Sequence, residues 1–397
     1  MSRKRSYPIL GSSLFIAGSC IGAGMLALPV LTGLAGFFPS LVNLCIAWAF
    51  MTYSSCLVLE MNSWFPNRVN LLSMLEKGLG PWGKRLCFFS YLFLFYTLCV
   101  AYIAASGRLI ARLSPGEWFS IEISSCLFVL LLTPCIYLGT KVTDYLNRLL
   151  VFGLFFTFFS MILWGLPNID LRYFLHVDGR FLLLSLPVLV LSFGFQNTIP
   201  SLSAYLERDW KSVQTAILGG SLSVLIIYLL WQILFIGTVP FAGKSGILAL
   251  YESREDATAP LYSLGIGSLS QGFAFFAIIT SFLAQSLTLV HFLADALHVP
   301  LTRKNRAWLS AVTLGPSLLI AISYPHIFYE ALQFAGGFCA MLLFGVLPVG
   351  AVFRGRYVAK IPASYRAIGG KATLGCAGIF ALFLLIQEME KMLGAFL

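Results

Sequence analysis

Two apolar segments of this chain, 16–29 and 191–200, carry glycines, small polar residues and a proline where a continuous helix needs good helix formers. A glycine costs about 1 kcal/mol relative to alanine in a helix interior, and a proline removes a backbone hydrogen bond. The sequence therefore predicts that both segments are helices broken near their middle. The residues responsible are Gly18, Gly22, Gly24 and Pro29 in the first segment and Gly194, Gln196, Asn197 and Pro200 in the second.

A break of this kind inside a membrane leaves backbone groups that can bind a small zwitterion. The half-helix that begins near Ala23 and Gly24 directs free N–H groups and its positive dipole end at the break, where a carboxylate can dock. Carbonyl groups freed on the other side can accept hydrogen bonds from an ammonium group, and leaving them unpaired in lipid is costly. A free amino acid satisfies both sets. The carbonyl groups in question belong to Gly18, Ser19, Phe193 and Gly194.

Ordinary helix packing is the alternative explanation for these glycines. Glycine and proline are commoner in membrane helices than in soluble ones, and small residues let helices approach closely. However, Gly22 and Gly194 lie 172 residues apart, and each begins a block of five predicted spans. Paired interrupted segments at matching positions of two halves are typical of transporter sites, so the pairing favours discontinuous helices.

The composition requires lipid as the solvent for most of the chain. Of its 397 residues, 59% are hydrophobic and 11% are charged, whereas a soluble domain is roughly 25% charged. The chain has a net charge of +10, and its basic residues lie in short loops between apolar runs. In that position they indicate membrane topology and not nucleic-acid binding. The nine cysteines form no CxxC pair, and His291, Asp295 and His298 on one helix face are better explained as a solvated surface. We therefore expect no metal and no cofactor.

Apolar runs of about 20 residues predict eleven membrane spans in one all-α polytopic domain that covers residues 1–397. The last span is the weakest, because Lys371 and Glu388 leave only 16 uncharged residues between them. The first apolar run is far too long for a signal peptide and forms two spans. The spans are expected near 9–33, 37–59, 86–107, 121–140, 149–167, 181–206, 212–239, 270–294, 307–324, 330–353 and 372–393.

The two blocks of five spans predict an inverted repeat. Five is an odd number, so the second block must cross the membrane in the opposite sense to the first. We expect repeat one near 9–167, repeat two near 181–353 and one extra C-terminal helix near 372–393. Helices 1 and 6 are then the discontinuous ones.

The basic residues predict the orientation. When successive loops between the predicted spans are assigned to opposite sides of the membrane, 19 of the 26 lysines and arginines lie on one side and 7 on the other. Cytoplasmic loops carry the excess, so the N-terminus is expected in the cytoplasm and the C-terminus outside. The external segment 240–269 is expected to be a solvated loop, with a partly helical cap over a vestibule as the alternative.

Around these residues the chain resembles the hydroxy and aromatic amino acid permease family, most closely its bacterial tyrosine-specific branch. The most specific match is Ile21-Gly-Ala-Gly-Met-Leu-Ala-Leu-Pro29. The resemblance implies a five-plus-five inverted-repeat core with one extra span, and uptake of an aromatic amino acid driven by a cation gradient, with proton coupling typical of the branch. Further matches are Gly11-Ser-Ser-Leu-Phe-Ile, Asp144-Tyr-Leu-Asn147-Arg148, Ser192-Phe-Gly-Phe195, Pro200-Ser201, Ser281-Phe-Leu283 and Leu293-Ala294-Asp295.

The chain departs from that pattern at two places. Gln196 and Asn197 stand where the tyrosine permeases tend to have histidine and glycine, and His291 stands where an acidic residue is expected. These departures bear on the choice of substrate and of ion, and not on the fold.

The candidate substrate site combines the two breaks with nearby aromatic side chains. An aromatic substrate gains about 0.5–1.5 kcal/mol from each ring contact beyond burial. With 15% aromatic residues, most rings of this chain must instead pack or face lipid. The candidates are Gly18, Ser19, Cys20, Ile21, Gly22, Ala23, Gly24, Phe193, Gly194, Phe195, Gln196 and, on the third span, Tyr96 and Tyr102.

The eighth span supplies the ion-coupling candidates Ala277, Thr280 and Ser281. Two adjacent hydroxyls, together with the carbonyls freed in the first break, would suit sodium. The alternative is that the hydroxyls bond back to the preceding helical turn. Proton coupling is favoured over sodium on the strength of the resemblance. The gating candidates, Glu60, Asp144 and Arg148, are ionisable residues expected at the cytoplasmic end.

Together these features predict a secondary active symporter of the bacterial inner membrane that imports tyrosine or tryptophan by alternating access, and not an enzyme. Cation and amino acid must jointly favour closure, because a ligand that binds both states equally drives nothing. The alternatives are a permease for small hydroxy or branched amino acids and a membrane-embedded lipid-modifying enzyme. The sequence does not decide between tyrosine and tryptophan, the stoichiometry or the oligomeric state.

Overall fold

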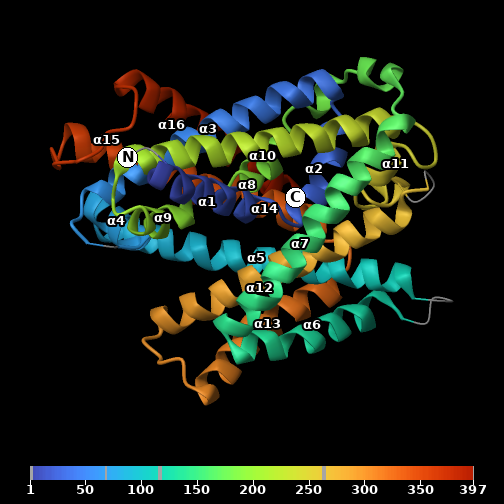
Figure 1. Ribbon diagram of the computed structural model, residues 1–397, viewed down its shortest axis with the longest axis horizontal. Coiled ribbons are helices and arrows are strands. Elements are labelled where there is room, and N and C mark those ends of the chain that lie inside the picture. Colours follow the sequence, from blue (N-terminus) through green and yellow to red (C-terminus); the bar gives the residue numbers. More distant parts are fainter. Residues whose placement is uncertain (1–2, 68, 115–118, 262–264, 397) are drawn as a thin grey trace.

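A computed structural model describes residues 3–67, 69–114, 119–261 and 265–396. Within these ranges the chain is helical and contains no strand (Figure 1). The elements are α1 (Arg3–Cys20), α2 (Gly24–Gly33), α3 (Phe37–Ser63), α4 (Leu71–Leu79), α5 (Pro81–Leu113), α6 (Ile121–Leu138), α7 (Thr140–Gly165), η2 (Leu166–Asn168), η3 (Leu171–Leu175), η4 (Gly179–Phe181), α8 (Leu186–Ser192), η5 (Gln196–Thr198), α9 (Ile199–Tyr205), α10 (Trp210–Thr238), α11 (Ile247–Glu252), α12 (Gly267–Ala296), α13 (Arg303–Ser323), α14 (Phe328–Phe334), η7 (Ala335–Val346), α15 (Leu347–Tyr357) and α16 (Lys371–Phe396).

Among the described residues, nine helices are long and apolar enough to cross a membrane, and α1 with α2 forms a tenth span bent by 69°. The predicted sixth span, 181–206, folds as α8, η5 and α9, each too short to cross by itself. A polytopic all-α protein is therefore confirmed. Eleven spans and the inverted repeat stay predictions, because they depend on counting α8 and α9 as one crossing.

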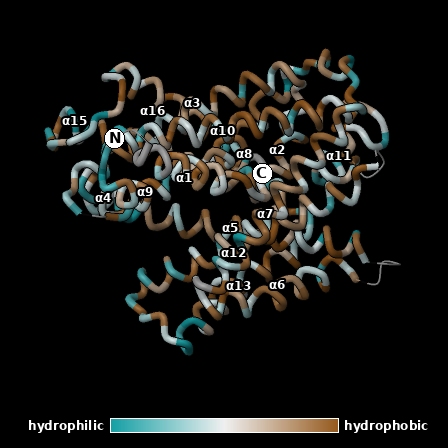
Figure 2. The backbone as a smooth tube through the Cα atoms, viewed as in Figure 1, coloured by the Kyte–Doolittle hydropathy of each residue, from teal (hydrophilic) through white to brown (hydrophobic). Residues whose placement is uncertain are grey.

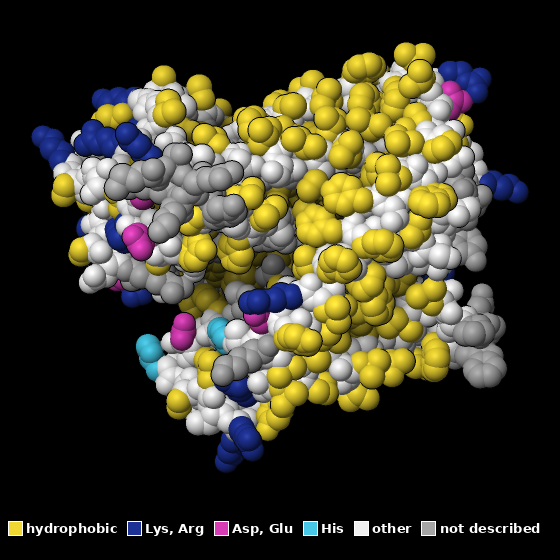
Figure 3. All heavy atoms as spheres, viewed as in Figure 1, with side chains coloured by type: hydrophobic (Ala, Val, Ile, Leu, Met, Phe, Trp, Pro, Cys, Tyr) yellow, Lys and Arg dark blue, Asp and Glu magenta, His cyan; other side chains and the backbone are white. Residues whose placement is uncertain are grey.

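The long helices lie side by side with their apolar middles aligned (Figure 2). The predicted cytoplasmic segments, which include α4, the end of α15 and the α12–α13 turn, lie together at the left of Figure 1. Figure 3 shows a hollow at this end, between the part formed by α4 and α9 and the part formed by the adjoining ends of α12 and α13. Hydrophobic side chains lie within the hollow.

The helix that follows α14 contains a π-helical stretch, η7, of 12 residues. Two adjacent glycines let neighbours approach its backbone. A Cβ on Gly336 would lie 1.9 Å from the carbonyl oxygen of Pro187 in α8, and a Cβ on Gly337 would lie 2.9 Å from Glu388 Cγ in α16. Since π-helical turns are frequent at functional sites, it is relevant that η7 packs directly against the first half of the interrupted sixth segment.

The segment between α10 and α12 differs from the expected solvated loop. It contains α11, and it packs on the molecule through buried Ile247, Leu250 and Ala257. The Ala257 N–H donates to the Leu26 carbonyl of α2 at 3.0 Å. The prediction was wrong because the acidic residues of this segment obscured its apolar ones. We call residues 240–261 the outer cap, after the outside location that the sequence predicts for them.

Charged side chains fasten the outer cap to α5 and α14. Arg108, buried at the end of α5, donates to the Arg254 carbonyl and lies over the Phe328 ring at 5.4 Å. Arg254 in turn pairs with Glu330 at 2.7 Å. These contacts join three elements around this end of the bundle. A further ion pair connects Arg112 with Glu255.

The segment between α7 and α8 lies against the turn between α2 and α3. The Asp178 N–H donates to the Ala35 carbonyl at 3.0 Å. The side chain of Arg180 hydrogen-bonds the Asp178 carboxylate and lowers its pKa to about 2. This carboxylate is therefore charged throughout the physiological pH range.

Candidate functional site

The first break occupies residues 21–23. Helix α1 ends at Cys20, where the Ile21 N–H still donates to the Ala17 carbonyl at 3.1 Å, and α2 begins at Gly24. The Met25 N–H then donates to the Gly22 carbonyl at 3.0 Å, which closes the first turn of the second half. The predicted interruption of this span is confirmed.

Helix α12 approaches the first break at Ser281. The Ala23 N–H donates to Ser281 Oγ at 2.9 Å, and Tyr102 of α5 lies beside the same serine. A Cβ on Gly22 would lie 2.3 Å from Ser281 Oγ, so a larger residue would push this hydroxyl away from its present position. The free N–H expected at the start of α2 is thus paired with a hydroxyl, the kind of acceptor that a carboxylate can replace.

The second break follows α8. The Phe193 N–H donates to Leu189 O at 3.2 Å and the Gly194 N–H to Leu191 O at 3.0 Å, after which the short turn η5 leads into α9. Phe193 and Phe195 are buried. The predicted interruption of the sixth segment is confirmed as well.

Gln196 connects the second break to α3. Its Nε2 donates to the Met51 carbonyl at 3.1 Å, while its Oε1 is buried and has no partner among the described residues. The amide is therefore held on the α3 side of the break, and its oxygen remains available to accept a hydrogen bond.

One side chain of α10, Tyr228, lies between the breaks. Its hydroxyl is 2.8 Å from the carbonyl oxygen of Cys20 at the end of α1 and 2.8 Å from that of Ser192 at the end of α8. Three residues on, Trp231 Nε1 donates to the Met25 carbonyl at 2.8 Å. Sequence reasoning missed Tyr228, because a tyrosine within an apolar helix carries no local signal.

The two predicted tyrosines of α5 have different surroundings. Tyr102 reaches Ser281 at the first break, as described above. Tyr96 donates its hydroxyl to the Val312 carbonyl of α13 at 2.9 Å, so this hydroxyl is bonded to α13 and not to either break.

The ion-coupling candidates are only partly brought to the first break. Thr280 Oγ1 donates back to Phe276 O at 2.8 Å and lies 3.1 Å from Ala277 O, which is the alternative considered for these hydroxyls. Ser281 contacts the break, through the Ala23 N–H and beside Gly22.

A comparison with known families covers nearly the whole chain. The family model described as the tryptophan/tyrosine permease family matches residues 5–388. The chain belongs to this family.

Individual relatives extend over the same length. A tryptophan-specific transport protein of Haemophilus influenzae is 30% identical over 100% of this chain and 99% of its own. The tyrosine-specific transport system 1 of the same organism is 33% identical over 92% of each chain. A protein named glutamine transporter 2, from Aliivibrio fischeri, is 26% identical over 97% of this chain and 100% of its own. The permease is thus a multi-pass transport protein of the bacterial inner membrane and not an enzyme.

The gating candidates of the permease do not pair with one another across elements. Asp144 and Arg148 form a 2.8 Å ion pair within α7, and both side chains are more than half exposed. Glu60 is fully buried and pairs instead with Arg356 of α15, whose Nε donates to Glu60 Oε1 at 2.7 Å. The Ala367 N–H also donates to this carboxylate, at 2.8 Å. The buried pair joins α3, α15 and the segment before α16.

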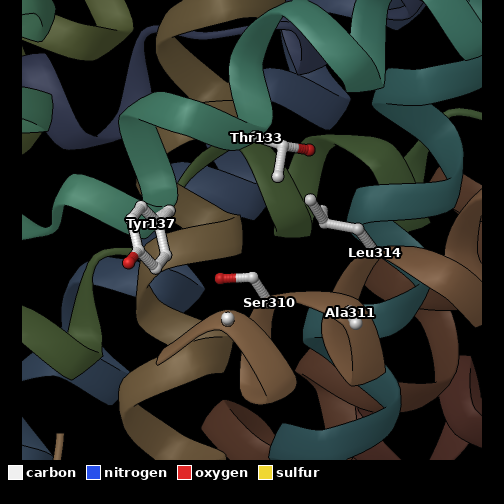
Figure 4. A pocket seen from close by; sticks show the side chains of 6 residues that line it. Thr133, Tyr137, Ser310, Ala311 and Leu314 are labelled. Carbon is white, nitrogen blue, oxygen red and sulfur yellow. The ribbon is translucent and has the colours of Figure 1, made fainter. Parts of the chain in front are cut away.

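A cavity of about 200 Å³ lies elsewhere in the permease, between α6 and α13 (Figure 4). Thr133 and Tyr137 face Ser310, whose buried hydroxyl has no partner among the described residues. Both helices lie at the lower edge of the bundle in Figure 1, away from the breaks. At the breaks, Phe193, Phe195 and Tyr228 are buried.

Proposed function

We propose that this permease is a secondary active symporter that imports tryptophan or tyrosine across the bacterial inner membrane, with protons as the coupling ion. The observation that carries the proposal is the pair of interrupted segments joined by one buried tyrosine. Membership of a family whose relatives are named for tryptophan and tyrosine supports the choice of substrate.

The substrate site lies between the breaks. The carboxylate of the substrate accepts hydrogen bonds from the N–H groups at the start of α2. It displaces Ser281 from Ala23, because a carboxylate accepts stronger hydrogen bonds than a hydroxyl. Its ammonium group binds the carbonyls that end α1 and α8. Its ring packs against the aromatic side chains beside the breaks, such as Phe193 and Tyr102.

The two ends of the bundle support alternating access. The outer cap closes one end through ion pairs, while the opposite end has the hollow described above (Figure 3). Binding of substrate and proton favours the state in which both ends close, since transport requires that both ligands prefer this state. The inverted repeat belongs to the same proposal and supplies the symmetry for the two access states.

Proton coupling is proposed over sodium on the strength of the resemblance to the tyrosine-specific branch. The Thr280 hydroxyl gives its proton to the Phe276 carbonyl within α12, which leaves its oxygen lone pairs unused, so sodium is the alternative that the experiment must exclude. Uptake of labelled tryptophan and tyrosine in proteoliposomes, with pH and sodium gradients imposed separately, tests this. We expect accumulation with the pH gradient alone. Accumulation only with sodium would overturn proton coupling.

Competing amino acids test the substrate class. Because one relative is named as a glutamine transporter, glutamine belongs in the panel beside serine, threonine and the branched amino acids. We expect tryptophan and tyrosine to compete at the lowest concentrations. A site that prefers glutamine or a small hydroxy or branched amino acid would contradict the aromatic assignment.

A further inference from the structure

Tyr228 is the one described side chain whose hydroxyl contacts the ends of both α1 and α8. The side chain is 0% exposed. Its ring meets Phe193 edge-on, with 5.2 Å between the ring centroids. The hydroxyl is equally distant, at 2.8 Å, from the carbonyl oxygens of Cys20 and Ser192.

The hydrogen-bonding capacity of these groups is unequal. A phenol has one proton to donate, whereas each carbonyl oxygen has two lone pairs. Tyr228 therefore occupies at most one lone pair on each carbonyl and cannot satisfy both fully at once. Because both carbonyl oxygens lie 2.8 Å from the Tyr228 hydroxyl, each keeps an unused lone pair close to this one point.

We propose that Tyr228 is the positioning residue for the ammonium group of the substrate. This inference rests on the proposed function. The tyrosine holds the carbonyls of Cys20 and Ser192 directed at a common point, and an ammonium group with three N–H donors completes their hydrogen bonding. The resulting bonds are charge-assisted and lie in a buried site, where such bonds are strong.

The role belongs to α10 as a rigid element. Trp231, one turn along the same helix, holds the Met25 carbonyl of α2 at 2.8 Å. The helix is 29 residues long and continuous, so it fixes the second half of the first break relative to the carbonyls that Tyr228 holds. Recognition of the amino group is thereby built on an uninterrupted helix and not on the break alone.

The inference predicts a selective effect on substrates with an amino group. We compare the binding of tryptophan and of its desamino analogue, indole-3-propionate, to the purified full chain. In Tyr228→Phe, we expect the affinity for tryptophan to fall roughly tenfold while that for the analogue changes little, because only tryptophan uses the carbonyls. The dissociation constant of the analogue divided by that of tryptophan should therefore fall by the same factor.

A control and a second variant make the test decisive. Tyr91→Phe removes the hydroxyl of another buried tyrosine, on α5, and should leave the ratio unchanged. Tyr228→His keeps a ring N–H donor, so its ratio should lie between those of the wild type and of Tyr228→Phe. This variant carries the test if Tyr228→Phe does not reach the membrane. Equal weakening of both ligands, or an unchanged ratio, would overturn the positioning role. Wild-type protein that binds neither tryptophan nor tyrosine would instead contradict the proposed function, and this inference with it.

Discussion

At the scale of single residues, the first break depends on the absence of a side chain at Gly22. A Cβ at this position would displace the Ser281 hydroxyl, which accepts the Ala23 N–H. Local sequence pattern was sufficient to find this residue, because a glycine-rich run before a proline weakens a helix wherever it occurs.

Gly22→Leu is therefore expected to abolish uptake without preventing insertion into the membrane. The added side chain would displace Ser281 and fill the place proposed for the carboxylate. Uptake in cells, normalised to the amount of permease in the membrane, measures the effect. Gly315→Leu is the matched control, since a Cβ at Gly315 meets nothing within 4 Å and uptake should persist. Full activity of Gly22→Leu would count against the site.

Other residues of the site were beyond sequence reasoning for a physical reason. Tyr228 is one of 16 tyrosines, and only the crossing of three chain segments gives its hydroxyl two carbonyl partners. Tyr96 has the same chemistry and a similar helical setting, yet its hydroxyl is bonded to α13. The identity of the residue could not separate these two cases, because hydrogen-bond partners distant in sequence depend on helix packing.

At the scale of elements, the sequence predicted where helices stop better than how they connect. Both interruptions were found, whereas the outer cap was taken for a loop. The partner of Glu60 was also missed, because Arg356 lies 296 residues away and meets it only when α15 packs on α3. Within this pair the Glu60 side chain is 0% exposed and that of Arg356 is 8% exposed.

Breaking the buried pair is expected to be costly. Arg356→Met leaves the Glu60 carboxylate buried without its cation, which destabilises a protein by about 3–5 kcal/mol. Thermal unfolding of the detergent-purified permease measures the loss. The double variant Glu60→Gln/Arg356→Met should recover much of it, because no charge then remains buried.

The exposed pair of α7 provides the comparison. Asp144→Asn should change stability by less than about 1 kcal/mol, as is usual for an exposed ion pair within one helix. If Asp144→Asn destabilised the permease as much as Arg356→Met does, the distinction between the two pairs would be wrong.

At the scale of the whole molecule, composition and span periodicity were enough to predict a polytopic helical protein. Lipid as solvent restricts a spanning chain of this hydropathy to helices, so the fold class follows with little need for tertiary detail. The packing of the interrupted halves is different, because it depends on close backbone approaches such as that of Gly336 to Pro187.

The eleven-span topology predicts that the two termini lie on opposite sides of the membrane. A C-terminal fusion to alkaline phosphatase, which is active only outside the cytoplasm, should be active, and a fusion to a fluorescent protein that matures in the cytoplasm should be dark. The reverse result would mean that α8 and α9 do not form a crossing together, or that α16 does not cross.

The central claim is that main-chain groups at two helix breaks bind both ends of a free amino acid. Equilibrium competition on the purified permease tests this most directly, with labelled tryptophan displaced by tryptophan, by its methyl ester and by its desamino analogue. We expect each modified compound to compete at least tenfold more weakly, because each lacks one of the two charged ends. Competition by either compound as strong as that by tryptophan itself would contradict it.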